Sequence, residues 1–312
     1  MELLIQIMLL VVGFVILIKG SDIFVSGSSN IATILKIPTL VVGLTIVAFG
    51  TSAPEAAVSI SASIQGSNAL AVSNIVGSNI FNILGIIGIC ALLKELKLGE
   101  NVAEKDIPFL LIVTLLVVGF ILLSWDITRI EGIILLILIV GYTAHLVYTS
   151  KKSKGAEFVE KPKFGIVRSI VYVIVGLIAI ILGAQLVVDA SSYIAMACGM
   201  SETLVGLTIV AIGTSLPELV TSLTALKRDE NQLVIGNVIG SNIFNILFVL
   251  GLSSAITPIT VSQNMIIDLA LMIFVTVLCL IFAKTDDKYD RKEGAILLGL
   301  FILYMAFVII RN

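Results

Sequence analysis

The sequence is short of charged residues. Only 13% of its 312 residues are Asp, Glu, Lys or Arg, whereas 58% are hydrophobic and the mean hydropathy is +1.16. A soluble domain of this length could not keep so many apolar side chains out of water. The composition therefore excludes a soluble protein. It predicts a chain whose surroundings are the lipid bilayer, and we expect no nucleic-acid partner.

Histidine and cysteine are also scarce. The single histidine, His145, excludes a metal site built from histidine ligands. The three cysteines lie in or beside apolar runs without CxxC spacing, so we interpret Cys90, Cys198 and Cys279 as apolar core residues. No positive charge precedes the first apolar run and no small-residue cleavage pattern follows it, so no signal peptide is predicted.

Ten apolar segments are long enough to cross a hydrocarbon core of about 30 Å. The longest polar connection, 150–165, is basic and too short to hold a domain. We therefore predict an all-α membrane protein with ten transmembrane helices, working as a monomer. The predicted spans are residues 3–30, 39–64, 69–93, 107–125, 130–149, 166–190, 203–226, 233–256, 264–283 and 293–310.

The distribution of lysine and arginine predicts the orientation. With alternating spans, sixteen of the 19 basic residues fall on one side, Arg129 and Arg311 on the other, and Lys19 within the first span. Basic residues accumulate on the cytoplasmic side. We therefore predict a multi-pass protein of the cell membrane with both termini outside and the 150–165 loop in the cytoplasm. Asp22, three residues from Lys19, is expected to form a solvated pair with it.

One stretch places a carboxylate inside an apolar run. Residues 43–59, GLTIVAFGTSAPEAAVS, begin as an apolar helix, break at Gly-Thr-Ser-Ala-Pro and place Glu55 directly after the proline. A carboxylate in lipid costs several kcal/mol, so it should face a protein cavity or an ion. The stretch recurs at 206–222 as GLTIVAIGTSLPELVTS, with Glu218 in the place of Glu55.

The recurrence extends well beyond this stretch. An offset of 163 residues holds without a gap from residue 20 to residue 88 of the first copy, and the fifth segments align after one slipped residue. Because each copy has an odd number of spans, the second enters the membrane from the opposite side. We predict inverted repeats whose helices break at a midplane ion site. The repeats are 1–149 (motif region 43–88) and 166–312 (motif region 206–251), joined by the linker 150–165.

A second motif follows one span later in each half. Residues 72–84 read VSNIVGSNIFNIL and residues 235–247 read IGNVIGSNIFNIL. Prolines 54 and 217 lack an N–H, so we expect freed backbone carbonyls near Ala48 and Ala211. The candidate ligands are thus all oxygen donors: Glu55, Glu218, Thr51, Thr214, Asn82, Asn245, Ser52, Ser78, Ser215, Ser241 and the carbonyls of Ala48 and Ala211.

An all-oxygen site with two carboxylates suits Ca²⁺, which takes about six to eight oxygen ligands, and Na⁺ would fit the neutral oxygens beside them. Mg²⁺ fits less well because it dehydrates reluctantly. Gly77, Ser73 and Ser59 can equally serve helix packing, and a neighbouring helix could satisfy a buried glutamate. Whether Asn79 and Asn242 face the same cavity stays open.

The hexapeptides at 50–55, 77–82, 213–218 and 240–245 resemble the alpha-repeats of the Ca²⁺/cation antiporter superfamily, specifically its sodium/calcium exchanger branch. The resemblance covers the whole chain. It implies a secondary antiporter that exchanges Na⁺ for Ca²⁺ by alternating access, without a cofactor, and not an enzyme. The first and sixth spans would slide across the other eight.

The resemblance also implies a role for each candidate ligand. Glu55 and Glu218 would be the central Ca²⁺ carboxylates, helped by the carbonyls of Thr51 and Thr214. The other candidates would serve the Na⁺ sites or complete the middle of the site: Ala48, Ala211, Ser52, Ser78, Ser215 and Ser241 for Na⁺, and Asn82 and Asn245 in the middle.

Two departures narrow the family branch. Potassium-dependent relatives carry an aspartate where this chain has Asn245, so we expect K⁺-independent exchange. Proton/calcium exchangers carry a histidine in the second motif, which GSNIFN lacks. These two exchanger types stay as alternatives, as do a cation channel and, more remotely, an intramembrane hydrolase. Transport is expected to be electrogenic if more sodium charge than calcium charge moves per cycle.

Overall fold

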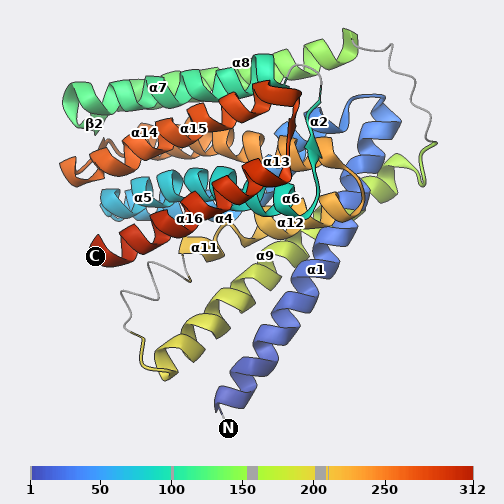
Figure 1. Cartoon of the computed structure of the whole chain (residues 1–312), viewed down its shortest axis with the longest axis horizontal. Helices are drawn as coiled ribbons and strands as arrows, with labels where there is room; N and C mark the ends of the chain where they lie inside the picture. The colour runs from blue at the N-terminus through green and yellow to red at the C-terminus, as the bar shows by residue number, and fades with distance from the viewer. Residues whose placement is uncertain (1, 100–101, 153–160, 201–208, 210, 312) are drawn as a thin grey trace.

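The computed structural model describes residues 2–99, 102–152, 161–200, 209 and 211–311, and over these the chain forms the all-α fold predicted (Figure 1). The first half contains α1 (Glu2–Leu35), α2 (Thr39–Val42), η1 (Gly43–Val47), α3 (Ala48–Thr51), α4 (Ala53–Ile64), α5 (Asn68–Ile80), η2 (Phe81–Ile87), α6 (Gly88–Leu93), β1 (Leu96–Lys97), η3 (Val102–Asp106), α7 (Ile107–Ser124), β2 (Asp126–Ile127) and α8 (Arg129–Lys152). The second half contains α9 (Ile166–Ala197), α11 (Ala211–Gly213), α12 (Leu216–Lys227), α13 (Asn231–Phe244), η5 (Asn245–Leu250), α14 (Gly251–Ile256), β3 (Ile259–Thr260), η6 (Gln263–Met265), α15 (Ile266–Asp286), β4 (Lys288–Tyr289) and α16 (Arg291–Arg311). The η segments are π-helical, except η6, which is a 3₁₀ turn.

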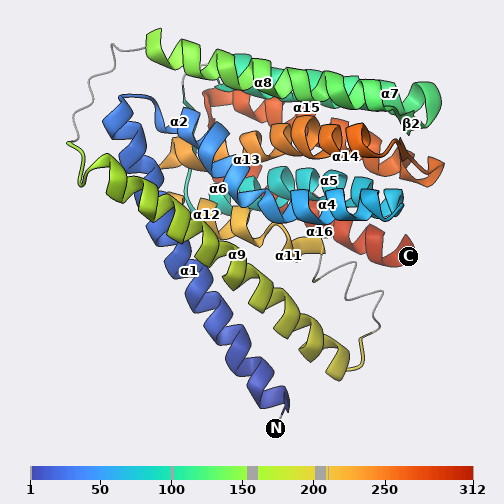
Figure 2. The same ribbon diagram turned by 180° about the vertical axis from the view of Figure 1, so that it is seen from behind.

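The two longest helices, α1 and α9, lie side by side and cross the others obliquely (Figures 1 and 2). They contain 34 and 32 residues, so each is about 50 Å long. This exceeds the roughly 30 Å of hydrocarbon, so in a bilayer each helix would tilt or extend beyond the hydrocarbon. Glycines bring them into backbone contact: a Cβ on Gly176 would lie 2.6 Å from the backbone nitrogen of Phe24, and one on Gly183 2.6 Å from that of Leu17.

The spans Asn68–Leu93 and Asn231–Ile256 fill the centre of the molecule. Each is continuous and nearly all buried, and consists of two α-helical pieces around a π-helical one: α5–η2–α6 and α13–η5–α14. α4 packs against α5, and α12 packs against α13. The segments that carry the two glutamates therefore lie directly on this core.

Two short antiparallel ladders join the two halves of the chain. β1 pairs with β4, with Leu96 opposite Tyr289, and β2 pairs with β3, with Ile127 opposite Ile259. β1 precedes η3 and α7 whereas β2 follows α7 directly, so the ladders lie at opposite ends of that span (Figure 1). Each ladder links a connection of one half to a connection of the other.

The described residues contain eight helices long and apolar enough to cross a membrane. Thr39–Thr51 and Ala53–Ile64, bent by 49°, pass the same test together and would make a ninth span if the pair crosses as one. The predicted span 203–226 begins in 203–208, outside the described residues, so the tenth span is not tested. α1 and α9 extend beyond the predicted ends at residues 30 and 190. At the first of these ends, the polar residues Ser28 and Asn30 are buried within the helix, so α1 continues past them.

Lys19 was predicted to be the basic partner of Asp22, and this prediction is wrong. Asp22 Oδ1 instead accepts a hydrogen bond from Arg228 Nη2 at 3.1 Å. Arg228 follows α12, which packs against α1, so the long guanidinium side chain reaches across from the neighbouring helix. A helix–helix contact of this kind cannot be read from spacing along one helix.

Candidate ion-binding site

The two glutamates lie in the first turns of α4 and α12, immediately after breaks in the helix. The break residues Ser52 (φ −82°, ψ 9°) and Ser215 (φ −93°, ψ 8°) have almost the same backbone conformation. A proline follows in the first turn of each new helix, where a missing N–H costs no intrahelical bond. The positive end of each helix dipole favours the carboxylates of Glu55 and Glu218.

The predicted freeing of the Ala48 carbonyl by the proline is wrong. This carbonyl accepts the backbone N–H of Ser52 at 3.0 Å. The helix continues for one more bond before it breaks, and the N–H that Pro54 lacks would have reached the carbonyl of Gly50, four residues earlier. Ala211 begins α11, but its side chain lies outside the described part, as do residues 206–208 and 210 of the predicted motif region.

Each glutamate accepts a hydrogen bond from the break serine of the other half. Ser215 Oγ donates to Glu55 Oε1 at 2.8 Å, and Ser52 Oγ donates to Glu218 Oε1 at 2.8 Å. Ser241 Oγ donates to the same Glu218 oxygen at 3.4 Å. Ser78, the matching residue in the first half, has its hydroxyl 3.1 Å from that of Ser215. All four candidate serines thus meet around the two carboxylates.

A second set of contacts crosses between α5–η2 and α13–η5. Asn82 Nδ2 donates to Asn242 Oδ1 at 2.9 Å, and Asn245 Nδ2 donates to Asn79 Oδ1 at 3.2 Å. Asn79 and Asn242 also donate to each other's backbone carbonyl, at 3.4 and 3.2 Å. All four asparagines therefore belong to one buried network. Asn82 and Asn245 each lie in or at the start of a π-helical turn, a feature frequent at functional sites.

Four buried oxygen atoms in this region have no hydrogen-bond partner among the described residues: Oε2 of Glu55 and Glu218, and Oδ1 of Asn82 and Asn245. Each of these residues is 0 or 1% exposed. They form two matched pairs: each half of the chain supplies one carboxylate oxygen and one amide oxygen. Leaving such acceptors unpaired away from water is costly, so four together indicate a site that receives a cation.

The charges point the same way. None of the ion pairs found in the described part of the chain includes Glu55 or Glu218. Two buried carboxylates without a basic partner carry a large desolvation cost that a bound cation offsets. The described residues also contain no group of three or more His, Cys, Asp or Glu side chains placed so that together they could hold a metal ion. The donors present are hard oxygen atoms, which suit Ca²⁺ and Na⁺ better than they suit transition metals.

Comparison with known proteins agrees with this donor set. The family model described as sodium/calcium exchanger protein matches residues 5–148 and 168–310. The chain belongs to the sodium/calcium exchanger family. This exchanger-family chain is 39% identical to the putative antiporter CaxA of Alkalimonas amylolytica, covering 96% of this chain and 98% of the relative. It is 32% identical to the sodium/calcium exchanger MaX1 of Methanosarcina acetivorans, covering 98% of each.

Solved structures of the sodium-calcium exchanger NCX_Mj have the same fold. The structure soaked with Na⁺ and Sr²⁺ superposes with a TM-score of 0.86 at 34% identity, over 97% of this chain and 98% of that chain. Membership of a family of transporters confirms that this exchanger-family chain is a multi-pass membrane protein and not an enzyme.

The candidate site includes two residues that the sequence analysis did not single out, Asn74 and Asn237. Thr51 Oγ1 donates to Asn237 Oδ1 at 3.0 Å, and Thr214 Oγ1 to Asn74 Oδ1 at 3.4 Å. Each asparagine also donates to the backbone carbonyl of the glutamate in its own half, Glu55 at 3.3 Å and Glu218 at 3.2 Å. Both asparagines stand at the 163-residue offset inside the second motif, and this signal could have found them.

Proposed function

We propose that this protein is a secondary antiporter that exchanges Na⁺ for Ca²⁺ across the membrane by alternating access. The observation that carries the proposal is the set of four unpaired buried oxygens on Glu55, Glu218, Asn82 and Asn245. Relatives named sodium/calcium exchangers that match nearly the whole chain support the choice of ions. Exchange is K⁺-independent in this proposal, because the residue at 245 is an amide and not a carboxylate.

The ligand roles follow from which oxygens are already engaged. Glu55 and Glu218 bind Ca²⁺ through their unpaired oxygens, and the carbonyls of Thr51 and Thr214 assist, because the Thr51 hydroxyl is used by Asn237. Na⁺ binds on either side of the carboxylates. Its proposed ligands are the hydroxyls of Ser52, Ser78, Ser215 and Ser241 and the carbonyls of Ala48 and Ala211, with Asn82 and Asn245 between. The Ala48 carbonyl would bind through the lone pair that does not accept the Ser52 N–H.

Sharing of the two carboxylates gives the coupling. One Ca²⁺ or several Na⁺ ions neutralise the pair, so the two kinds of ion compete for it. The empty site holds two uncompensated buried charges, which are costly to carry through a closed state, and this opposes uncoupled leak. α1 and α9, joined to each other by close glycine contacts, are the pair that slides across the other helices.

The membrane arrangement is part of the proposal. Residues 1–149 and 166–312 form two inverted repeats joined by the linker 150–165, and the monomer is the transporting unit. Both termini lie outside and the linker lies in the cytoplasm. Matched contacts at the 163-residue offset, such as the reciprocal bonds of Asn79 and Asn242, support the repeat division.

Uptake of ⁴⁵Ca²⁺ into proteoliposomes tests the exchange itself. Vesicles loaded with Na⁺ are expected to accumulate ⁴⁵Ca²⁺, and vesicles loaded with K⁺ or with acid are not. Uptake driven by the proton gradient alone would instead place the protein with proton/calcium exchangers. Conductive Ca²⁺ flux that does not saturate and shows no counter-flow would indicate a channel.

Sodium-driven uptake is expected to respond to voltage. If more sodium charge leaves than calcium charge enters, each surplus charge couples to the membrane potential at about 2.3 kcal/mol per 100 mV. Valinomycin and a K⁺ gradient set the vesicle potential, and the initial rate of ⁴⁵Ca²⁺ uptake is measured at each potential. The control is valinomycin without K⁺, which should leave the initial rate at its value without ionophore. Initial rates that do not change with the imposed potential would contradict electrogenic exchange.

Ser52 and Ser215, the serines at the two helix breaks, should contribute equally to the KM for Ca²⁺. Ser52→Ala and Ser215→Ala each remove one hydrogen bond to a buried carboxylate, a bond worth about 1.5–3 kcal/mol. We expect each variant to raise the KM for Ca²⁺ at least about tenfold, by similar factors because the two contacts are reciprocal. Ser73→Ala, at an exposed position of α5, is the control and should leave the KM unchanged. An effect in only one of the two break-serine variants would contradict a shared site.

A further inference from the structure

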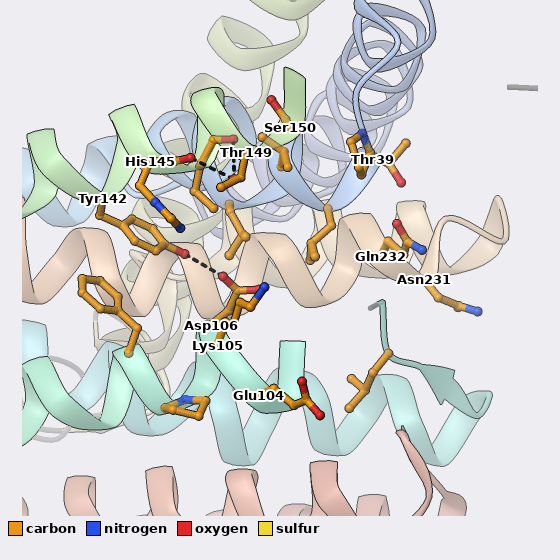
Figure 3. A pocket seen from close by; sticks show the side chains of 18 of the residues that line it. Thr39, Glu104, Lys105, Asp106, Tyr142, His145, Thr149, Ser150, Asn231 and Gln232 are labelled. Atoms are coloured by element: carbon orange, nitrogen blue, oxygen red, sulfur yellow. Dashed lines mark hydrogen bonds between the residues drawn. The ribbon is translucent and has the colours of Figure 1, made fainter. Parts of the chain in front are cut away.

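A large cavity lies apart from the ion site, on the face predicted to be cytoplasmic. Its volume is about 1740 Å³, and parts of α2, α7, α8 and the start of α13 line it. None of the candidate ion ligands is among its lining residues. Figure 3 shows its polar side, where Asp106 points toward the hydroxyl of Tyr142.

Asp106 is a buried carboxylate on the wall of this cavity. It is 7% exposed, and its Oδ1 accepts a hydrogen bond from Tyr142 Oη at 3.2 Å. Although it precedes α7, its side chain makes no capping bond to that helix. The basic groups that act on it are Lys105, exposed on the same turn, and His145 on α8. No ion pair found among the described residues includes Asp106.

The second half of the chain contains a matching carboxylate, 162 residues later. The match is fixed by Thr114 and Thr276, whose hydroxyls both donate to the carbonyl four residues earlier. It is also fixed by Trp125 and Asp287, which both end their helices with positive φ. At this offset Asp106 corresponds to Asp268.

Asp268 is neutralised by the chain itself. It is 5% exposed, and Arg311 Nη2 donates to its Oδ2 at 2.9 Å. The guanidinium carbon of Arg311 lies 5.1 Å from the centre of the Phe307 ring, one turn earlier on α16. This end of the molecule thus holds a carboxylate, a guanidinium and an aromatic face together.

The first half has the carboxylate without the guanidinium. At the same offset, Thr149 stands where the second half has Arg311, and His145 where it has Phe307, while Tyr142 matches Tyr304. Thr149, His145 and Tyr142 all line the cavity (Figure 3). Among the described residues no basic side chain lies within ion-pair distance of Asp106; a buried carboxylate left in this state is costly, and the cavity offers room beside it.

We propose that this cavity binds an organic cation that carries a guanidinium head and an apolar body. The head pairs with Asp106, in the geometry in which a guanidinium offers two parallel N–H groups to a carboxylate. The body lies against apolar walls that include Leu44 and Leu146, beside the stacked rings of Phe109 and Tyr142, whose centres are 4.5 Å apart. The cavity is far larger than a bare metal ion needs.

Benzylguanidine is the probe, because it combines the head with a small aromatic body. Titration calorimetry on the full-length protein in nanodiscs is expected to show saturable binding. The uncharged analogue benzylurea should bind at least about tenfold more weakly, since a hydrogen bond to a charged group is worth about 1.5–3 kcal/mol. No transport is measured, so the result is independent of the proposed exchange.

Two variants test the role of the carboxylate. Asp106→Asn should weaken benzylguanidine binding by a similar factor. Thr149→Arg supplies the guanidinium from the chain itself, as in the second half, and should abolish binding while raising the thermal unfolding midpoint. Glu104→Gln changes an exposed acid of the same cavity and should leave the affinity unchanged. Absence of binding to the wild type, equal binding of benzylurea, or unchanged affinity in Thr149→Arg would each overturn the proposal.

Discussion

Replacing either site glutamate is expected to abolish Ca²⁺ transport. In Glu55→Gln or Glu218→Gln, sodium-driven ⁴⁵Ca²⁺ uptake should fall at least about 100-fold, because each variant removes one of the two carboxylates that would pair with the bound Ca²⁺, and removing one partner of a buried ion pair costs about 3–5 kcal/mol. The serine contact survives in each variant, since the new side-chain amide oxygen still accepts from Ser215 or Ser52. The loss is therefore one of charge, and the double variant should be no worse than either single one.

Thermal unfolding separates this loss from misfolding. Without ions, both glutamine variants should unfold at a higher temperature than the wild type, because each removes an uncompensated buried charge. Ca²⁺ at about 100 times its Kd should stabilise the wild type by roughly 2.7 kcal/mol and leave the variants unchanged. Glu95→Gln, an exposed acid that pairs with Lys288, serves as the control. Wild-type uptake in Glu55→Gln would eliminate the assignment of the site.

The second large effect is expected at the contact between α1 and α9. A Cβ on Gly183 would lie 2.6 Å from the backbone nitrogen of Leu17, and backbone cannot move aside as a flexible side chain does. Gly183→Leu should therefore force the two helices apart and abolish transport. Gly183→Ala should destabilise the protein by about 1–3 kcal/mol through overpacking.

Gly119 on α7 is the matched control. A Cβ there would meet nothing within 4 Å, so Gly119→Ala should stabilise the helix by up to about 1 kcal/mol. Glycine-to-alanine substitution should thus lower the stability at Gly183 and raise it at Gly119. Urea or thermal unfolding in detergent measures both. A neutral or stabilising result for Gly183→Ala would show that α1 and α9 do not depend on this contact.

Much of the site was predictable because its signals are local and repeated. The break at Pro54, the carboxylate after it and the second motif each occur twice at one offset, so each copy supports the other. Burial of Glu55 and Glu218 followed from the cost of a carboxylate in lipid. The all-α class followed in the same way, from apolar runs too long for anything but spans.

The remaining features depend on contacts between segments distant in the sequence. Spacing along one helix could pair Asp22 with Lys19 but could not bring in Arg228, which comes from α12. The ladder between Leu96 and Tyr289 joins two short connections between helices, and neither connection has a sequence pattern that predicts a strand. Asn79 could be placed in the asparagine network only once its partner across the core, Asn242, was known.

The crossed serine–glutamate bonds have a consequence for biosynthesis. Ser215, which donates to Glu55, is 160 residues further along the chain. At a synthesis rate of about 5–20 residues per second, that separation takes roughly 10–30 s to translate. Through this interval the first glutamate has been synthesised and its partner has not. The nascent first half must therefore carry an unfinished site until the second half arrives, so the proposed ion binding could begin only after most of the chain is made.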